Sequence, residues 1–146
     1  MIKIGRRGSL SCVLEVEGTQ GHIAYPHLSK NPITSLIEIC KKLKEKPLDK
    51  GNKHFQASNL EFTAINVDNQ AHNVIPARAR TQFNIRYNNF HTSISLKKMI
   101  TKVIRSICNT HDKLPLLPIL IISPSLFGFV GPPTIQKFIF SFFLIK

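Results

Sequence analysis

Acidic residues are scarce in this sequence. Its 146 residues include 8 Asp and Glu against 20 Lys and Arg, which gives a formal net charge of +12. A metal site needs several convergent carboxylate, imidazole or thiolate ligands, and the closest two histidines, His22 and His27, do not have a recognised ligand spacing. We therefore expect no metal-binding residue in this chain. The positive charge favours anionic partners, whether nucleic acid, acidic lipid or a carboxylate-bearing small molecule.

Cysteines are few and an export signal is lacking. Cys12, Cys40 and Cys108 lie far apart, match no zinc-binding spacing and cannot all pair within one chain. The amino-terminal basic residues are not followed by the apolar stretch of about 7 to 15 residues that marks a secretory signal. These absences predict a cytoplasmic protein. Catalytic serine and cysteine signatures are also missing, so the residues alone leave open whether the chain is an enzyme.

Composition divides the chain in two. The length suits one domain, and the 42% of hydrophobic residues excludes global disorder. Residues 114–146, however, contain no acid, two lysines, five of the nine prolines and six of the ten phenylalanines. We therefore expect an ordered domain over residues 1–112 and an apolar, Pro- and Phe-rich tail over residues 113–146. The prolines argue against a membrane-spanning helix in this tail.

Strand patterns recur along the ordered part. Apolar residues alternate with polar ones over residues 9–17 and 79–87, as in strands with one buried face. Residues 60–67 are rich in apolar and β-branched side chains, which also predicts a strand. A short final strand is expected over residues 116–122, although Pro118 weakens it.

Two helices are expected between these strands. Asn31 can cap a helix that begins with Pro32 and stops before Pro47, and Thr92 or Ser93 can cap a second amphipathic helix. The order of elements predicts an α+β fold of the ferredoxin-like split βαβ type, an antiparallel sheet with two helices on one face. The bare face and the edge strands must then be wetted, covered or paired with another chain.

Three short stretches hold candidate binding residues. In the run GRRGS, the guanidinium groups of Arg6 and Arg7 suit bidentate binding of a carboxylate, or form a solvated basic loop. In QGH, glycine allows close approach of the backbone, while His22 either binds a ligand or is simply exposed. In HNVIP, Asn73 can donate to a ligand or close its own turn.

These stretches belong to a longer pattern. The run GRRGSLSCVLEVEGTQGHIAYPHLSKNPI, followed by HNVIPARARTQFNIRYNN, closely resembles the lid or dimerisation domain of bacterial succinyl-diaminopimelate desuccinylases. That family belongs to the two-zinc aminoacylase and carboxypeptidase superfamily. The resemblance covers about residues 3–110, and GRRGS, QGHxAYPH and NVIP in this order are highly specific.

The resemblance implies a lid that interrupts a zinc catalytic domain. In the family, the ligands of both zinc ions and the general-base glutamate come from segments before and after the lid, and we find none of those segments here. We therefore expect no cofactor in this chain and no activity by itself, although the family hydrolyses N-succinyl-diaminopimelate in lysine and diaminopimelate biosynthesis. The implied partners are a second copy of the chain, joined through the sheet edge and a helix of the lid, and a separate zinc catalytic domain. Nucleic acid and membrane are not expected as partners.

The resemblance also implies roles for single residues. Arg6 would grip a substrate carboxylate, and Asn73 would contact the substrate. His22 would cross the dimer to the partner's active site and stabilise the oxyanion of the amide being hydrolysed. Three further residues of the signature are expected to shape the loop first: Tyr25, Pro26 and His27.

The sequence also departs from the family pattern. Cys12 stands where the family commonly has glycine, and His72 stands where asparagine or threonine is usual, so substrate contact by His72 is not expected. Beyond Asp112 we find no continuation of the family pattern, and the tail resembles translation of a shifted reading frame.

The main alternative is a basic ferredoxin-like module that binds nucleic acid. This arrangement also serves RNA-recognition domains, and the charge of +12 would attract phosphates. Residues 80–87, however, lack the glycine and the aromatic spacing of the RNA-recognition motif. A third hypothesis, a membrane-associated interaction protein, rests on the tail and the positive charge alone.

Overall fold

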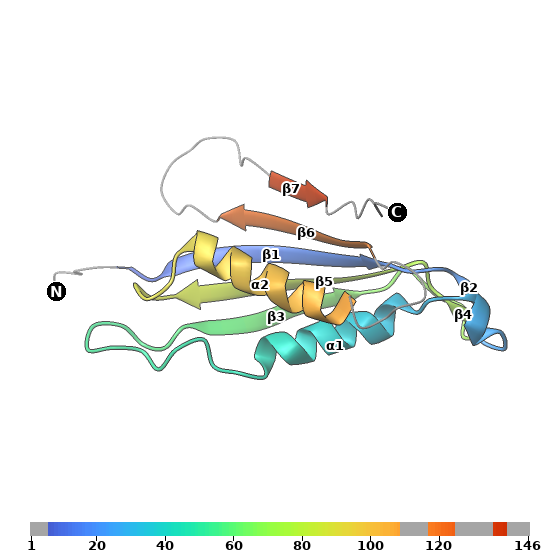
Figure 1. Cartoon of the computed structure of the whole chain (residues 1–146), viewed down its shortest axis with the longest axis horizontal. Helices are drawn as coiled ribbons and strands as arrows, with labels where there is room; N and C mark the ends of the chain where they lie inside the picture. The colour runs from blue at the N-terminus through green and yellow to red at the C-terminus, as the bar shows by residue number, and fades with distance from the viewer. Residues whose placement is uncertain (1–5, 109–116, 125–135, 140–146) are drawn as a thin grey trace.

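A computed structural model describes residues 6–108, 117–124 and 136–139 of the chain (Figure 1). The strands are β1 (Gly8–Glu17), β2 (Gly21–His22), β3 (Asn59–Asn66), β4 (Val74–Ile75), β5 (Arg78–Tyr87), β6 (Leu117–Pro124) and β7 (Gln136–Ile139). The helices are α1 (Pro32–Lys44), α2 (Ser93–Cys108) and one turn of 3-10 helix, η1 (Pro26–Leu28).

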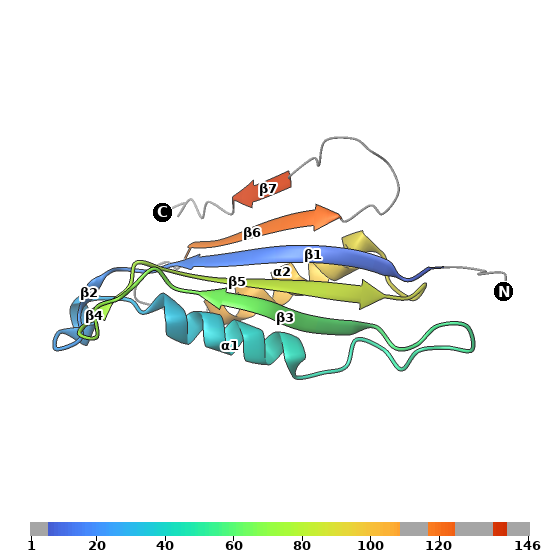
Figure 2. The same ribbon diagram turned by 180° about the vertical axis from the view of Figure 1, so that it is seen from behind.

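A five-stranded sheet in the order β3-β5-β1-β6-β7 forms the centre of the fold, and all neighbouring strands in it are antiparallel. Both long helices lie on one face of this sheet, and Figure 2 shows the opposite face. This arrangement confirms the predicted α+β class with two helices on one face. The order β3-β5-β1-β6 is consistent with the expected split βαβ type, and β7 is an additional edge strand. The short pair β2 and β4 extends from one end of the sheet (Figure 1).

The helix starts follow from local hydrogen bonds. Asn31 Oδ1 accepts from the main-chain N–H of Ile33 at 3.0 Å, which confirms the expected cap of α1. At the start of α2, Thr92 Oγ1 accepts from Ser95 N–H at 3.1 Å while Ser95 Oγ accepts from Thr92 N–H at 3.0 Å. This reciprocal pair resembles a capping box, with serine in place of the usual Glu or Gln. It identifies Thr92 rather than Ser93 as the cap.

One apolar core fills the space between the helices and the sheet. On β1 and β5 the buried residues alternate with less buried ones, as a strand with one covered face requires. Phe83 is 1% exposed, and its ring centroid lies 5.5 Å from that of Phe62 on β3 in an edge-to-face contact. The other buried apolar residues of β1, β5 and the two helices are Leu10, Cys12, Leu14, Val16, Ala79, Ile85, Leu36, Ile39, Leu43, Leu96, Ile100 and Ile104.

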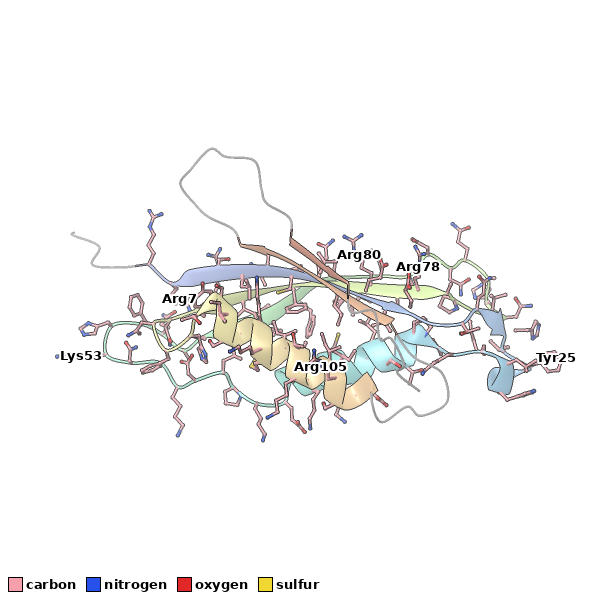
Figure 3. All side chains as sticks on the ribbon, turned by 45° about the horizontal axis from the view of Figure 1, so that its top comes forward. Arg7, Tyr25, Lys53, Arg78, Arg80 and Arg105 are labelled. Carbon is pink, nitrogen blue, oxygen red and sulfur yellow. The ribbon has the colours of Figure 1, made fainter. Side chains whose placement is uncertain are left out.

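The face of the sheet away from the helices is polar. Asn84 Nδ2 donates to Ser11 Oγ at 2.9 Å, and Arg78 Nε lies 3.1 Å from Glu17 Oε1. Figure 3 shows the labelled side chains of Arg78 and Arg80 on the side of the sheet opposite α2. On β1 and β5 the bare face therefore carries hydrogen bonds and an ion pair, which water can wet without an apolar cover.

Candidate functional site

The three candidate binding residues lie at two ends of the sheet. His22 is in β2 and Asn73 directly precedes β4, in the pair of short strands at one end (Figure 1). Arg6 precedes β1 at the other end. Since β1 has ten residues and a strand rises about 3.3 Å per residue, roughly 30 Å separates the two ends. The fold thus brings His22 and Asn73 together and leaves Arg6 apart.

The pair of His22 and Asn73 is built across β2 and β4. His22 is directly opposite Val74, and the main-chain N–H of Ile23 donates to the Asn73 carbonyl at 3.1 Å. Between the side chains, Asn73 Nδ2 lies 3.4 Å from His22 Nε2, although the residues are 51 positions apart in the chain. Both side chains are exposed. His22 therefore lies in the short strand β2, and its ring is accessible to a ligand.

Nearby residues of the segment between Thr19 and Lys30, which we call the histidine loop, lie beside the ring of His22. The main-chain N–H of Ala24 donates to His22 Nδ1 at 3.1 Å. The Tyr25 ring centroid is 6.1 Å from that of His22 and 6.4 Å from that of His27. Figure 3 shows Tyr25 at the tip of the molecule. These side chains form one exposed group of two imidazoles and a phenol.

Close contacts inside the loop fix its shape. Thr19 and Lys30 exchange two main-chain hydrogen bonds of 3.0 Å, which close the loop at its base. Gly21 lies against Ser29, and a Cβ added at Gly21 would be 2.6 Å from the Ser29 Cβ. Only glycine allows this approach without a shift of the backbone. Close packing against Ser29 therefore explains the glycine of the QGH motif. Pro26 begins the 3-10 turn η1 that follows.

The turn before β4 depends on Asn69 rather than on Asn73. Asn69 Oδ1 accepts from Ala71 N–H at 3.1 Å, and Asn69 Nδ2 donates to the Val74 carbonyl at 2.8 Å. An asparagine that binds the backbone two residues ahead forms an Asx turn. Sequence reasoning gave this role to Asn73 as an alternative and overlooked Asn69. The Asn73 amide instead faces the imidazole.

The arginines at the other end differ in their contacts. Arg6 is exposed, whereas Arg7 is half-buried and its Nη1 donates to the Ala57 carbonyl at 3.3 Å. A Cβ added at Gly8 would overlap the ring of Tyr87, which explains the second glycine of the GRRGS motif. Figure 3 shows Arg7 and Lys53 at this same end of the molecule. Arg6 is therefore an exposed residue at the start of an anchored strand.

A buried carboxylate organises the loop near these arginines. Asp49 accepts from Gly51 N–H at 2.7 Å, from Asn88 Nδ2 at 2.8 Å and from Ser58 N–H at 3.2 Å. Burial alone would raise the pKa of Asp49, but hydrogen bonds from Ser58, Gly51 and Asn88 outweigh it and lower the pKa to about 2. His91 Nε2 lies 3.1 Å from Asp49 Oδ2 without the alignment of a hydrogen bond. Sequence reasoning missed Asp49, whose only local signal is the turn pattern Asp-x-Gly.

Among the described residues there is neither a cluster of metal ligands nor a reactive thiol at Cys12. Within residues 6–108, 117–124 and 136–139, no group of three His, Cys, Asp or Glu residues could hold a metal ion. Burial raises the pKa of the Cys12 thiol to about 12, against a smaller lowering by Lys97, so Cys12 is protonated at neutral pH. None of the helices described is both long and apolar enough to cross a bilayer.

The chain is similar to a known domain family and to curated enzymes. Residues 4–112 match the model of the peptidase dimerisation domain. The succinyl-diaminopimelate desuccinylase of Pelagibacter ubique (strain HTCC1062) is 59% identical over 107 residues, which cover 73% of this chain and 28% of that protein. The enzyme of the same name from Erythrobacter litoralis (strain HTCC2594) is 54% identical over 103 residues, 70% of this chain and 27% of that protein.

Solved structures share the fold at low sequence identity. The aminopeptidase PepT from Bacillus cereus ATCC 10987 has a TM-score of 0.61 at 10% identity, over 81% of this chain and 29% of that chain. The aminobenzoyl-glutamate utilization protein from Klebsiella pneumoniae has a TM-score of 0.61 at 13% identity, over 79% of this chain and 28% of that chain. The chain therefore spans less than a third of the length of these relatives. The comparisons give no support to the nucleic-acid-binding alternative.

Proposed function

Because this chain belongs to the peptidase dimerisation domain family, we propose that it is the lid and dimerisation part of a succinyl-diaminopimelate desuccinylase. The catalytic part that completes the enzyme would hydrolyse the amide of N-succinyl-diaminopimelate, a step of diaminopimelate and lysine biosynthesis. We also propose that this part alone does not hydrolyse the substrate, because its described residues offer no group of three metal ligands. The supporting observation is the juxtaposition of His22 and Asn73, which joins two motifs of the resemblance at one exposed place.

The two zinc ions of this enzyme would be held by its catalytic part. The described residues offer no group of three metal ligands, and the imidazole of His22 contacts a main-chain amide, an asparagine and a tyrosine ring instead. These neighbours do not fit a zinc site, and we derive no step through a metal from this chain. The free thiols of Cys12 and Cys40 agree with the reducing cytoplasm, where we place the enzyme.

His22 would act as a hydrogen-bond donor in the active site of the partner subunit. Hydrolysis of an amide passes through a tetrahedral intermediate whose oxygen carries negative charge. A donor fixed where this charge develops contributes about 10²-fold or more to the rate. His22 lies in β2, inside the segment that the main-chain hydrogen bonds between Thr19 and Lys30 close, so it can be presented to a neighbouring molecule without losing its orientation. Asn73, beside it, would contact the substrate through its amide.

Arg6 would bind a carboxylate of the substrate. Its guanidinium is exposed and precedes a strand that Arg7 and Tyr87 hold in place. A planar guanidinium binds a carboxylate through two parallel hydrogen bonds, which fixes orientation as well as charge. Since Arg6 and His22 are at opposite ends of β1, they would serve different active sites of the dimer.

The dimer would form through the edge of β3 and the neighbouring helix α1. In the described part of the chain β3 pairs with β5 alone, while β6 covers the other side of β1. Two exposed apolar side chains lie on these elements: Ile65 on β3 is 62% exposed and Ile37 on α1 is 59% exposed. An open strand edge with apolar residues beside it favours pairing with a second copy about a two-fold axis.

The tail has a separate place in this proposal. Residues 1–112 would form the lid unit, and residues 113–146 would replace the family's continuation through a shifted reading frame. The backbone of β6 pairs with β1 from Leu117 to Pro124, so part of the tail extends the sheet. Family motifs found in another frame of the gene would support this, and an uninterrupted family-like frame that ends in this tail would refute it.

Sedimentation velocity tests the dimer. The purified chain should sediment as a dimer, and Ile65→Lys should shift it to monomer because a charge enters the proposed contact. Ile94→Lys is the matched control, since Ile94 is 64% exposed on α2, away from the β3 edge. A monomeric wild type, or equal dissociation of both variants, would refute this interface. Zinc analysis of the purified chain should show little metal, and an assay on N-succinyl-diaminopimelate should show no hydrolysis. A metal-loaded, active chain would refute the proposal that a separate catalytic part holds the zinc ions.

A chimera tests the catalytic role. Residues 4–112 would replace the matching lid of the Pelagibacter ubique enzyme, which is 59% identical. We expect hydrolysis by this chimera, and a loss of about 10²-fold in kcat with His22→Ala at unchanged zinc content. His27→Ala, on the same loop, should change kcat little. Unchanged turnover in the His22 variant would remove its proposed role.

A further inference from the structure

The Nδ1 atom of His22 has a donor as its partner. The main-chain N–H of Ala24 points to it at 3.1 Å. A neutral imidazole carries one proton, and the nitrogen that accepts a hydrogen bond is the one without it. The proton of the neutral ring is therefore on Nε2. In many histidine sites a carbonyl or carboxylate accepts from Nδ1–H instead, and the opposite tautomer results.

The Nε2 atom faces the amide of Asn73. In the structure Asn73 Nδ2 is 3.4 Å away. Two N–H groups cannot bond to each other, and the oxygen and nitrogen of an asparagine amide exchange places by a half turn of the side chain. After this half turn, Asn73 Oδ1 accepts from Nε2–H and the NH₂ group points away from the ring. The tautomer fixed by Ala24 thus decides which end of the Asn73 amide faces His22.

The backbone holds these groups on two sides of one ring. The Ile23 N–H donates to the Asn73 carbonyl at 3.1 Å, and the Tyr25 N–H donates to the His22 carbonyl at 3.0 Å. Both bonds are independent of the imidazole itself. No carboxylate of the described residues contacts the ring, so its orientation depends on neutral groups.

We propose that Asn73 and the main-chain N–H of Ala24 are positioning groups, which fix the tautomer of the neutral His22 ring so that Nε2–H is its ring donor. In the resting lid, Asn73 Oδ1 occupies the place of the acceptor. When an oxyanion arrives, it replaces Oδ1 as the acceptor from Nε2–H, and the proton is already on the correct nitrogen. A donor that needs no change of tautomer is preorganised for the reaction. The catalytic meaning rests on the proposed function, whereas the tautomer is a property of this chain alone.

Nitrogen NMR of the histidine rings in the full chain tests the tautomer. At about pH 8, we expect Nδ1 of His22 to resonate as an unprotonated nitrogen and Nε2 as a protonated one, without averaging. A scalar coupling between Ala24 N and His22 Nδ1 should be measurable across the hydrogen bond. His54, exposed in the loop at the other end, is the internal control and should show averaged ring nitrogens. Averaged nitrogens at His22, or a proton on Nδ1, would overturn the proposal.

Two variants test the part assigned to Asn73. Asn73→Ala removes the acceptor, so the nuclear Overhauser contacts between the His22 ring and β4 should be lost while the tautomer stays fixed by Ala24. Asn73→Asp keeps an acceptor for Nε2–H and should preserve these contacts. Ring contacts that persist in the alanine variant, or vanish in the aspartate variant, would refute the positioning role.

Hydrogen exchange of the Ile23 amide shows whether β2 and β4 remain paired in each variant. If β2 and β4 separate in the Asn73→Ala variant, the Asn73→Asp variant alone tests the positioning role, because its contacts between the His22 ring and β4 must persist. An inactive chimera with an unaveraged His22 would refute the proposed function and leave the positioning intact. An active chimera in which the ring nitrogens of His22 are averaged would refute the positioning and leave the proposed function intact.

Discussion

Replacing Asp49 by asparagine tests how the loop beside the arginines is held. The side chain of Asp49 is 10% exposed and accepts hydrogen bonds from Gly51, Asn88 and Ser58. Burial raises its pKa, but these hydrogen bonds are stronger in effect and lower it from 3.8 to about 2. At about 1.4 kcal/mol per pKa unit, the depression is worth about 2 kcal/mol of folding free energy.

The sign of the pH dependence follows from the direction of this shift. A carboxyl group with a depressed pKa in the folded state stabilises the fold above its unfolded pKa, here near pH 4. This contribution is lost as the pH falls toward about 2, because the folded state must then bind a proton at a site built for the anion. The Asp49→Asn variant has no carboxyl group to titrate there, and its neutral amide oxygen is a weaker acceptor than the carboxylate for the donors of Gly51, Ser58 and Asn88.

Urea unfolding at fixed protein concentration measures the effect, since dimerisation would add to the apparent stability. At pH 7 we expect Asp49→Asn to lower the free energy of unfolding by about 2 kcal/mol, and its difference from wild type should shrink to near zero by about pH 2. Asp68→Asn, at an exposed carboxylate, is the control and should stay within about 0.5 kcal/mol. A difference that does not change with pH, or a neutral variant at pH 7, would refute the reasoning.

Three further predictions concern the core and the histidine loop. Phe83→Ala should cost about 3 to 5 kcal/mol in urea unfolding, since Phe83 is 1% exposed, whereas Phe90→Ala at a 60% exposed ring should cost under about 0.5 kcal/mol; equal costs would contradict the assigned core. Gly21→Ala should displace the loop against Ser29, with amide shifts confined to that loop, and an unchanged spectrum would contradict the close contact. A thiol reagent at about pH 8 should label Cys12 only after unfolding, and rapid labelling at Cys12 itself in the folded chain would show that β1 is not buried.

The sequence predicted the elements whose signals are local. Alternating burial on β1 and β5 follows the alternation of apolar residues, and Asn31 with Pro32 marks the start of α1. The strands β2 and β4 were missed because two residues have no periodicity. Their pairing joins segments about fifty residues apart, and only the folded chain brings these together.

In the candidate site, too, local features could be predicted and long-range contacts could not. The resemblance singled out His22 and Asn73, but their contact at 3.4 Å depends on the pairing of β2 with β4, which no local pattern indicates. The choice between Thr92 and Ser93 as the cap of α2 required the position of a serine hydroxyl. Asp49 was missed because its partners come from a loop and from the end of a distant strand.

The length of β1 limits what one lid can do. This strand is paired with β5 and β6 on its two sides, so the separation of roughly 30 Å between its ends is rigid. An amide substrate the size of an extended tripeptide spans only about 10 Å. One lid therefore cannot place both Arg6 and His22 on the same substrate molecule. In a two-fold dimer, each active site would take Arg6 from one lid and His22 from the other.

Mixing two inactive chimeras tests this arrangement. On the proposed function, Arg6→Ala and His22→Ala would each damage both sites of their own homodimer. In a mixed dimer, one site receives both substitutions and the other receives none. Random reassociation of equal amounts makes half of the dimers mixed, so activity should recover to about a quarter of that of the unsubstituted chimera. If both residues instead acted from one lid on one site, every site would carry one defect and mixing would restore nothing.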